Sequence, residues 1–357
     1  LKVWQQQPAA FFEQAIIEAD GTEVETGGEC KEGIGVSYKG TWGYNVLNMS
    51  LANTGEPIYI DNRGANVSSQ QGAAARFDQA IALVRRAGFR SVLLRGDTDF
   101  SQTQHLDRWN SDGVQFVFGY DAVPNLVEKA DSLPEAVWQR LERQPKYEVK
   151  TEPRTPRENF KAAIVEQKEY LNFYLVKEDV AEFDYQPRAC SKTYRMVALR
   201  KTITVERGQK LLYPETRYFF YITNRTDLSI AEVVASANDR CNQENLNAQL
   251  KGDVRALRAP VDTLVSNWAY MVMTALAWSM KAWFALLLPT TGRWRDRYRD
   301  EQRCLLRMEF RTFLNAMIRI PAQIVRTGRR IVFRLMAYNR WLPALFRGVE
   351  GLRVLRC

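Results

Sequence analysis

The chain has 357 residues, 46% of them hydrophobic, so it can bury a large core. This length predicts two or three structural units. It contains one histidine, His105, which excludes metal sites that need several imidazoles. Its five cysteines are widely spaced and form no CxxC pair, which argues against a disulfide framework or a zinc site. The net charge of +9 suits a polyanion such as nucleic acid, and the cysteine usage fits a reducing cytosol.

The first 145 residues alternate between strand-like and helix-like patterns. We expect strands at 12–20, 44–52, 57–62, 91–95 and 114–120, and helices at 70–88, 105–110 and 133–143. Three strands therefore precede the first helix, and this order fits a ribonuclease-H-like mixed sheet better than a doubly wound fold, in which strands and helices alternate from the start. In such a sheet the acids that end the first and fourth strands, Asp20 and Asp97, are neighbours.

The rest of the chain divides into three further segments. Residues 146–225 predict a β-rich insertion: charges dominate over 147–185, where the pattern weakens, and strand-like alternation returns over 193–223. Residues 226–290 predict helices that complete the core. The apolar stretch 268–288 is long enough to span a bilayer, but Lys281 interrupts it, so we expect a buried helix. No secretory signal is evident at the N-terminus.

The C-terminal region carries the positive charge of the chain. Residues 291–357 hold 16 arginines, no lysine and five acids, a net charge of +11, and the remaining residues sum to about −2. Arg326, Arg329 and Arg330 fall at helical spacing in a helix expected over about 297–340. A solvated helix face shows the same pattern, but the arginine excess is larger than solubility requires, so we predict that these three contact DNA phosphates.

Three carboxylates are candidates for chemistry. Phosphodiester cleavage without histidine is well served by two divalent metal ions, which favour Asp and Glu oxygens. Asp20 and Asp97 end predicted strands, and Glu244 lies on a predicted helix between Arg240 and Lys251, which return to its face. Taken singly, each acid also has an ordinary structural explanation, because acids after strands form turns and Glu244 can pair with Arg240.

A resemblance across nearly the whole chain favours the metal site. The segments ADGTEV, YKGTWGYNVLNMSLANTGE and LLRGDTDF, the spacing Arg240-x3-Glu244-x6-Lys251, and the tail MEFRTFLNAMIRIPAQIVRTGRR resemble insertion-sequence transposases of the DDE class. Within the IS-four-like superfamily, they are most similar to the IS-thirteen-eighty group.

That resemblance implies a specific activity and site. It implies a ribonuclease-H-like core, a β-rich insertion between the second and third acids, and cut-and-paste transposition with Mg²⁺ or Mn²⁺, two ions being expected. Asp20, Asp97 and Glu244 match the catalytic, metal-binding triad, and Arg240 and Lys251 match the DNA-binding positions around the third acid. The implied partners are transposon ends, target DNA and a second copy of the chain, in the bacterial cytoplasm at the nucleoid and without a membrane.

Two features of the sequence leave alternatives open. The superfamily pattern has a Tyr three residues before the Arg, where this chain has Ala237, and Asp99 rivals Asp97 as the second ligand. The chain also begins only 19 residues before Asp20, so we expect a fragment that lacks a preceding DNA-binding region. The competing hypotheses are an inactive remnant that only binds DNA and, more weakly, a membrane-associated protein built around residues 268–288.

Overall fold

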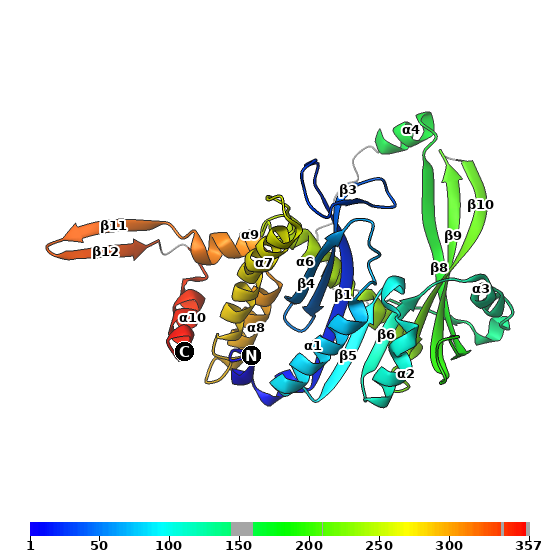
Figure 1. Cartoon of the computed structure of the whole chain (residues 1–357), viewed down its shortest axis with the longest axis horizontal. Coiled ribbons are helices and arrows are strands. Elements are labelled where there is room, and N and C mark those ends of the chain that lie inside the picture. The colour runs from blue at the N-terminus through cyan, green and yellow to red at the C-terminus, as the bar shows by residue number, and fades with distance from the viewer. Residues whose placement is uncertain (144–159, 209, 337–338, 355–357) are drawn as a thin grey trace. The chain divides into compact units, whose positions relative to one another are not determined.

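A computed structural model describes residues 1–143, 160–208, 210–336 and 339–354 (Figure 1). The chain divides into two compact units. The first comprises Leu1–Gly96, Ser111–Val114 and Arg240–Cys357, and the second comprises Asp97–Asn110 and Gln115–Asp239. The predicted segment boundaries at 145, 225 and 290 stay predictions.

The first unit is built on a mixed β-sheet. Its strands are β1 (Gln14–Glu25), β2 (Gly35–Val36), β3 (Trp42–Leu51), β4 (Glu56–Gly64) and β5 (Ser91–Gly96). β3 pairs antiparallel with β1, β2 and β4, while β5 pairs parallel with β1. The strand order β4-β3-β1-β5, with three antiparallel strands before the first helix, confirms the predicted ribonuclease-H-like mixed sheet.

The prediction that the first strand ends at Asp20 was wrong. β1 continues to Glu25, and its register with β3 runs unbroken from Ile17 to Glu25. Gly21, directly after the predicted end of the strand, serves close packing, because a Cβ there would lie 2.5 Å from the Ser69 hydroxyl oxygen. Asp20 therefore projects from the middle of a rigid strand.

Of the α-helices described in this unit, the first three contact the sheet and the last three contact the third helix. They are α1 (Ala73–Ala87), α6 (Cys241–Lys251), α7 (Leu264–Leu286), α8 (Arg295–Arg307), α9 (Phe310–Phe313) and α10 (Leu342–Val354). α1 ends as predicted at Gly88, whose φ of 107° favours glycine. Met271, Ala275 and Trp278 of α7 pack with Leu246 and Leu250 of α6 and with apolar residues of β3 and β4. This packing fixes α6 on the sheet.

α7 is only partly buried, which corrects the expectation of a buried helix over 268–288. One side packs in the core, but Met273 and Met280 are exposed. Lys281, which interrupts the apolar stretch, is buried and donates to the Leu306 carbonyl (3.0 Å) and to that of Met308. Among the helices that the structure describes, none is long and apolar enough to cross a bilayer.

The long helix predicted over about 297–340 was also wrong. α8 and α9 are followed by a π-helical turn at Leu314–Ile318 and then by a hairpin of β11 (Ala322–Thr327) and β12 (Arg330–Leu335). Pro321 lacks the amide hydrogen that a helix needs, and Gly328, with φ 55°, forms the turn. In the described part of the C-terminal region, the helices α8, α9 and α10 therefore flank this hairpin.

The second unit is rich in antiparallel strands. Its strands run in the order β6-β10-β9-β8-β7, namely β6 (Gln115–Tyr120), β10 (Lys210–Thr223), β9 (Tyr194–Arg207), β8 (Leu171–Tyr185) and β7 (Gln139–Arg140). Its helices are α2 (Thr103–Ser111), α3 (Pro124–Asp131), α4 (Phe160–Gln167) and α5 (Ile230–Asn238). The Ser229 side chain caps α5 by accepting from the Glu232 amide.

Two expectations failed in this unit. The helix predicted over 133–143 is absent, because α3 begins earlier, with Pro124 in its first turn, and Pro134 disfavours helical backbone at the preceding residue. β8 was missed, because its sequence LNFYLVKEDVAEFDY mixes charges with apolar residues and β8 exposes much of its first half. Pairing with β9 along nearly its whole length, rather than alternation, stabilises β8 as a strand.

Candidate active site

Asp20 is held by a buried amide network between β1, β3 and α6. The Asn247 side-chain amide donates to Asp20 Oδ2 at 2.8 Å, and Asn48 donates to Asn247 Oδ1 at 2.7 Å. Asn48 lies directly opposite Asp20 in the β1–β3 register. Gln243, one turn before Asn247, donates to the Asn48 carbonyl oxygen at 3.2 Å, which anchors the same face of α6. The network fixes the Asp20 carboxylate against α6.

Glu244 lies on α6 one helical turn before Asn247. Residues three apart on a helix are neighbours, so Glu244 and the Asn247 contact with Asp20 share one side of α6. Glu244 is exposed and pairs with Arg240 at 3.5 Å, the separation expected of an i,i+4 ion pair. The structure thus brings Asp20 of β1 into contact with α6, the helix that carries Glu244, and both acids lie in the first unit.

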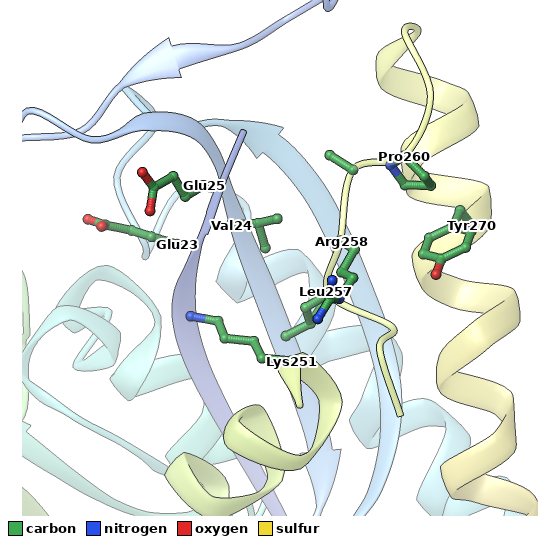
Figure 2. A pocket seen from close by; sticks show the side chains of 9 residues that line it. Glu23, Val24, Glu25, Lys251, Leu257, Arg258, Pro260 and Tyr270 are labelled. Atoms are coloured by element: carbon green, nitrogen blue, oxygen red, sulfur yellow. The ribbon is translucent and has the colours of Figure 1, made fainter. Parts of the chain in front are cut away.

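Lys251 ends α6 and lies in the electric field of the acids on β1. Desolvation lowers the pKa of the Lys251 ammonium, while the negative charges of Glu23 and Asp20 act in the opposite direction. Figure 2 shows Lys251 extending from the end of α6 toward β1. The predicted basic residues Arg240 and Lys251 therefore lie at opposite ends of the helix that carries Glu244.

A pocket of about 570 Å³ opens beside Lys251 (Figure 2). Its lining residues come from β1, from the end of α6, from the loop that follows and from α7: Glu23, Val24, Glu25, Lys251, Leu257, Arg258, Ala259, Pro260 and Tyr270. Arg258 and Tyr270 add a second cation and an aromatic ring that we had not predicted, because neither belongs to a recognisable motif. The pocket combines basic and acidic groups.

Asp97 follows β5 directly and is the first residue of the second unit. Its side chain caps a short 3-10 turn, Thr98–Phe100, by accepting from the Asp99 amide at 3.1 Å. Gly119 of β6 permits this turn to pack closely, since a Cβ there would lie 2.9 Å from the Thr98 nitrogen. Asp97 is half-buried and its rival Asp99 is exposed, so only Asp97 has its carboxylate fixed by this turn.

A buried ion pair aligns the two strands that lead to Asp20 and Asp97. Arg95 of β5 and Glu18 of β1 are paired in the parallel register, and their side chains meet at 2.6 Å. Their side chains are 6% and 1% exposed. Each of the two predicted aspartates comes two residues after one member of this pair. Within the described part of the chain, no three Asp, Glu, His or Cys side chains are gathered as a metal site.

The C-terminal arginines lie on the β11–β12 hairpin rather than on a helix. Arg326, Arg329 and Arg330 are all exposed, together with Arg334. The β-branched residues Ile324, Val325 and Thr327 before Gly328 are a strand signal that the helical interpretation passed over.

Comparison with known families decides the class of this chain. The family model described as transposase DDE domain group 1 matches residues 4–357. The chain belongs to this transposase DDE domain family. No curated protein matches it in sequence. A solved structure, described as a cryo-EM structure of piggyBac transposase synaptic complex with hairpin DNA, is similar with a TM-score of 0.42 and 9% identity. That match covers 85% of this DDE domain chain but only 54% of the solved chain, about half its length.

Proposed function

We propose that this DDE domain is the catalytic core of a DNA transposase of the IS-thirteen-eighty group, which cuts and rejoins phosphodiester bonds in cut-and-paste transposition. Family membership over residues 4–357 supports the reaction class. The observation that carries the assignment of residues is the hydrogen bond from Asn247 to Asp20, because it joins the first predicted acid to the helix of the third. Asp20, Asp97 and Glu244 are the proposed catalytic residues.

The chemistry of these side chains fits a hard divalent cation. All three offer carboxylate oxygens, the ligands that Mg²⁺ and Mn²⁺ prefer. Asn247 donates to one oxygen of Asp20, the kind of outer hydrogen bond that orients a metal-binding carboxylate. Two ions held by Asp20, Asp97 and Glu244 would supply charge stabilisation for the attacking and leaving oxygens.

The basic residues of α6 are suited to hold the DNA backbone. In the structure Arg240 is engaged by Glu244, and we propose that binding of a cation by Glu244 releases the guanidinium for a DNA phosphate. Lys251, at the other end of α6, would hold a second phosphate as a point charge. Arg240 and Lys251 would thereby keep the scissile phosphate beside the two acids of this unit, Asp20 and Glu244.

The reaction follows from this arrangement as two in-line displacements. In the first, water attacks phosphorus at a transposon end, and the bond from phosphorus to the 3′ oxygen breaks, which leaves a 3′ hydroxyl. In the second, that hydroxyl attacks a phosphorus of target DNA and the target strand's 3′ oxygen leaves. The chain contributes positioning and charge neutralisation. We propose that two copies act together on DNA in the bacterial cytoplasm, associated with the nucleoid.

Cleavage by matched aspartate variants tests this function. The substrate is duplex DNA that carries the sequences flanking the coding region on both sides, incubated with the full chain and Mg²⁺. We expect the unmodified chain and Asp99→Ala to release the ends, while Asp97→Ala loses at least 100-fold in rate. Equal product from Asp97→Ala would overturn the triad, and DNA binding without cleavage by the unmodified chain would identify an inactive remnant.

A further inference from the structure

The β11–β12 hairpin is a two-stranded ribbon that extends away from α8 and α10 (Figure 1). Each strand has six residues, so the ribbon is roughly 20 Å long at about 3.3 Å per residue. An isolated two-stranded ribbon with exposed apolar side chains is only marginally stable in water. A bound ligand surface would therefore stabilise a ribbon of this kind.

The strand register divides the ribbon into two faces. Directly opposed residues of an antiparallel pair point to the same side. The pairs Gln323–Arg334, Val325–Val332 and Thr327–Arg330 form one side, which we name the reading face. The pairs Ala322–Leu335, Ile324–Phe333 and Arg326–Ile331 form the other side, which we name the apolar face.

The charge of the ribbon indicates the kind of ligand. Ala322–Thr327 and Arg330–Leu335, with the turn between them, contain four arginines and no acid. All four arginines, Arg326, Arg329, Arg330 and Arg334, are exposed. None of the four forms an ion pair with an acidic side chain in the described residues. Uncompensated, exposed arginines on a thin ribbon complement a polyanion rather than an apolar protein surface.

We propose that the reading face enters the major groove of duplex DNA and reads base edges. This inference rests on the proposed transposase function and deepens it, because it assigns sequence recognition to the β11–β12 hairpin rather than to β1, β5 or α6, which carry or precede the proposed catalytic residues. The major groove is wide enough, at about 12 Å, to admit a two-stranded ribbon. The ribbon thus would select the DNA on which the carboxylates act.

The side chains of the reading face match the donors and acceptors of base pairs. Arg330 and Arg334 can each donate twice to guanine O6 and N7, and Gln323 can pair with adenine N6 and N7. The Val325–Val332 pair between them offers an apolar contact for thymine methyl groups. These side chains can therefore contact base edges along the length of the reading face.

Arg326 and Arg329 have a different role. Arg329 lies in the turn and Arg326 on the apolar face next to it, so both flank the reading face near the tip. Arginines at the rim of a groove meet phosphates, which strengthen binding without distinguishing sequences. The predicted phosphate contact thus fits Arg326 and Arg329, whereas Arg330 takes part in base reading.

Selection from a random duplex pool tests the assignment. The full chain is incubated with the pool, and the enriched sequences are compared among the unmodified chain, Gln323→Ala, Arg334→Ala and Arg329→Ala. We expect the unmodified chain to enrich a defined motif. Arg334→Ala and Gln323→Ala should each lose about ten-fold preference at one or two base pairs, since one bidentate contact carries discrimination of that order.

Arg329→Ala is the matched control. It should keep the motif and weaken binding to all sequences alike. The slope of log K against the logarithm of the salt concentration should fall by about one in magnitude. Unchanged motifs for both Arg334→Ala and Gln323→Ala would overturn the inference. It would also be overturned if Phe333→Ser, on the opposite face, abolished both self-association and the motif while Arg334→Ala kept the motif, because the ribbon would then be a contact between two copies.

The catalytic residues separate this inference from the proposed function. Asp20→Asn should keep the same motif as the unmodified chain, because Asp20 lies on β1 and not on the ribbon. A motif that depends on Arg334 in a chain that never cleaves DNA supports base reading and contradicts the proposed activity. If the unmodified chain cleaves DNA and the motif stays the same in Arg334→Ala and Gln323→Ala, the result supports the activity and contradicts base reading.

Discussion

Removal of either member of the buried Arg95–Glu18 pair should strongly destabilise the first unit. The two side chains meet at 2.6 Å and are 6% and 1% exposed, so both charges are buried and removal of one leaves the other buried without this partner. Breaking such a pair costs about 3–5 kcal/mol, because an uncompensated charge stays buried. We therefore expect Glu18→Ala and Arg95→Ala each to lower the free energy of unfolding by about that amount.

Urea denaturation at pH 7, followed by circular dichroism, measures this effect. The control is the exposed pair Arg90–Glu13, which joins the chain just before β5 to the chain just before β1, with side chains 65% and 60% exposed. Arg90→Ala should cost less than about 1 kcal/mol. The double replacement Glu18→Leu with Arg95→Met should recover most of the loss, since apolar residues of similar volume often substitute for a buried pair. A loss below 1 kcal/mol in Glu18→Ala would show that water compensates the pair and would refute the reasoning.

Three further predictions follow from groups around the core. Asn247→Leu removes the donor to Asp20 and should weaken Mn²⁺ binding about 10–100-fold, measured by calorimetry, whereas an unchanged affinity would show that Asn247 does not orient Asp20. Hydrogen bonds from Tyr194 and Ser191 lower the pKa of Asp107 to about 2, so this residue's stabilisation is complete above pH 4 and is lost as the pH falls toward 2. The melting temperature of Asp107→Asn should therefore fall less between pH 4 and pH 2 than that of the unmodified chain. An equal fall in both would contradict the assignment. Burial lowers the pKa of Lys281 to about 7, so the unfolded chain binds the proton more tightly between pH 7 and 10 and stability from this residue rises with pH. The melting temperature of Lys281→Met relative to the unmodified chain should consequently fall from pH 6.5 to pH 9, and a difference independent of pH would contradict it.

The core sheet could be predicted from sequence because its signals are local. Trp42–Leu51 and Glu56–Gly64 alternate on either side of a turn, and Gly88 stops an amphipathic helix at the expected residue. The end of β1 could not be predicted, since Asp20-Gly21 resembles a turn in sequence. What keeps β1 extended is its pairing with β3 and the space that Gly21 leaves for Ser69, both of which are long-range contacts.

The candidate site was predictable only in part. The spacing of Arg240, Glu244 and Lys251 places them along one helix, and the structure keeps them there. Asn247 and Asn48 escaped prediction, because a buried amide network has no sequence signature and forms only when β1, β3 and α6 meet. The C-terminal arginines were assigned the wrong element because their spacing fits a helix, whereas Pro321 and Gly328 determine a hairpin.

The central claim is that Asp20, Asp97 and Glu244 together bind divalent metal. The most direct test is a crystal structure of the full chain grown with Mn²⁺, in which anomalous scattering locates the ions. The account predicts anomalous peaks within about 2.0–2.3 Å of carboxylate oxygens of Asp20, Asp97 and Glu244. Peaks at other acids, or peaks that touch Asp99 in place of Asp97, would contradict it.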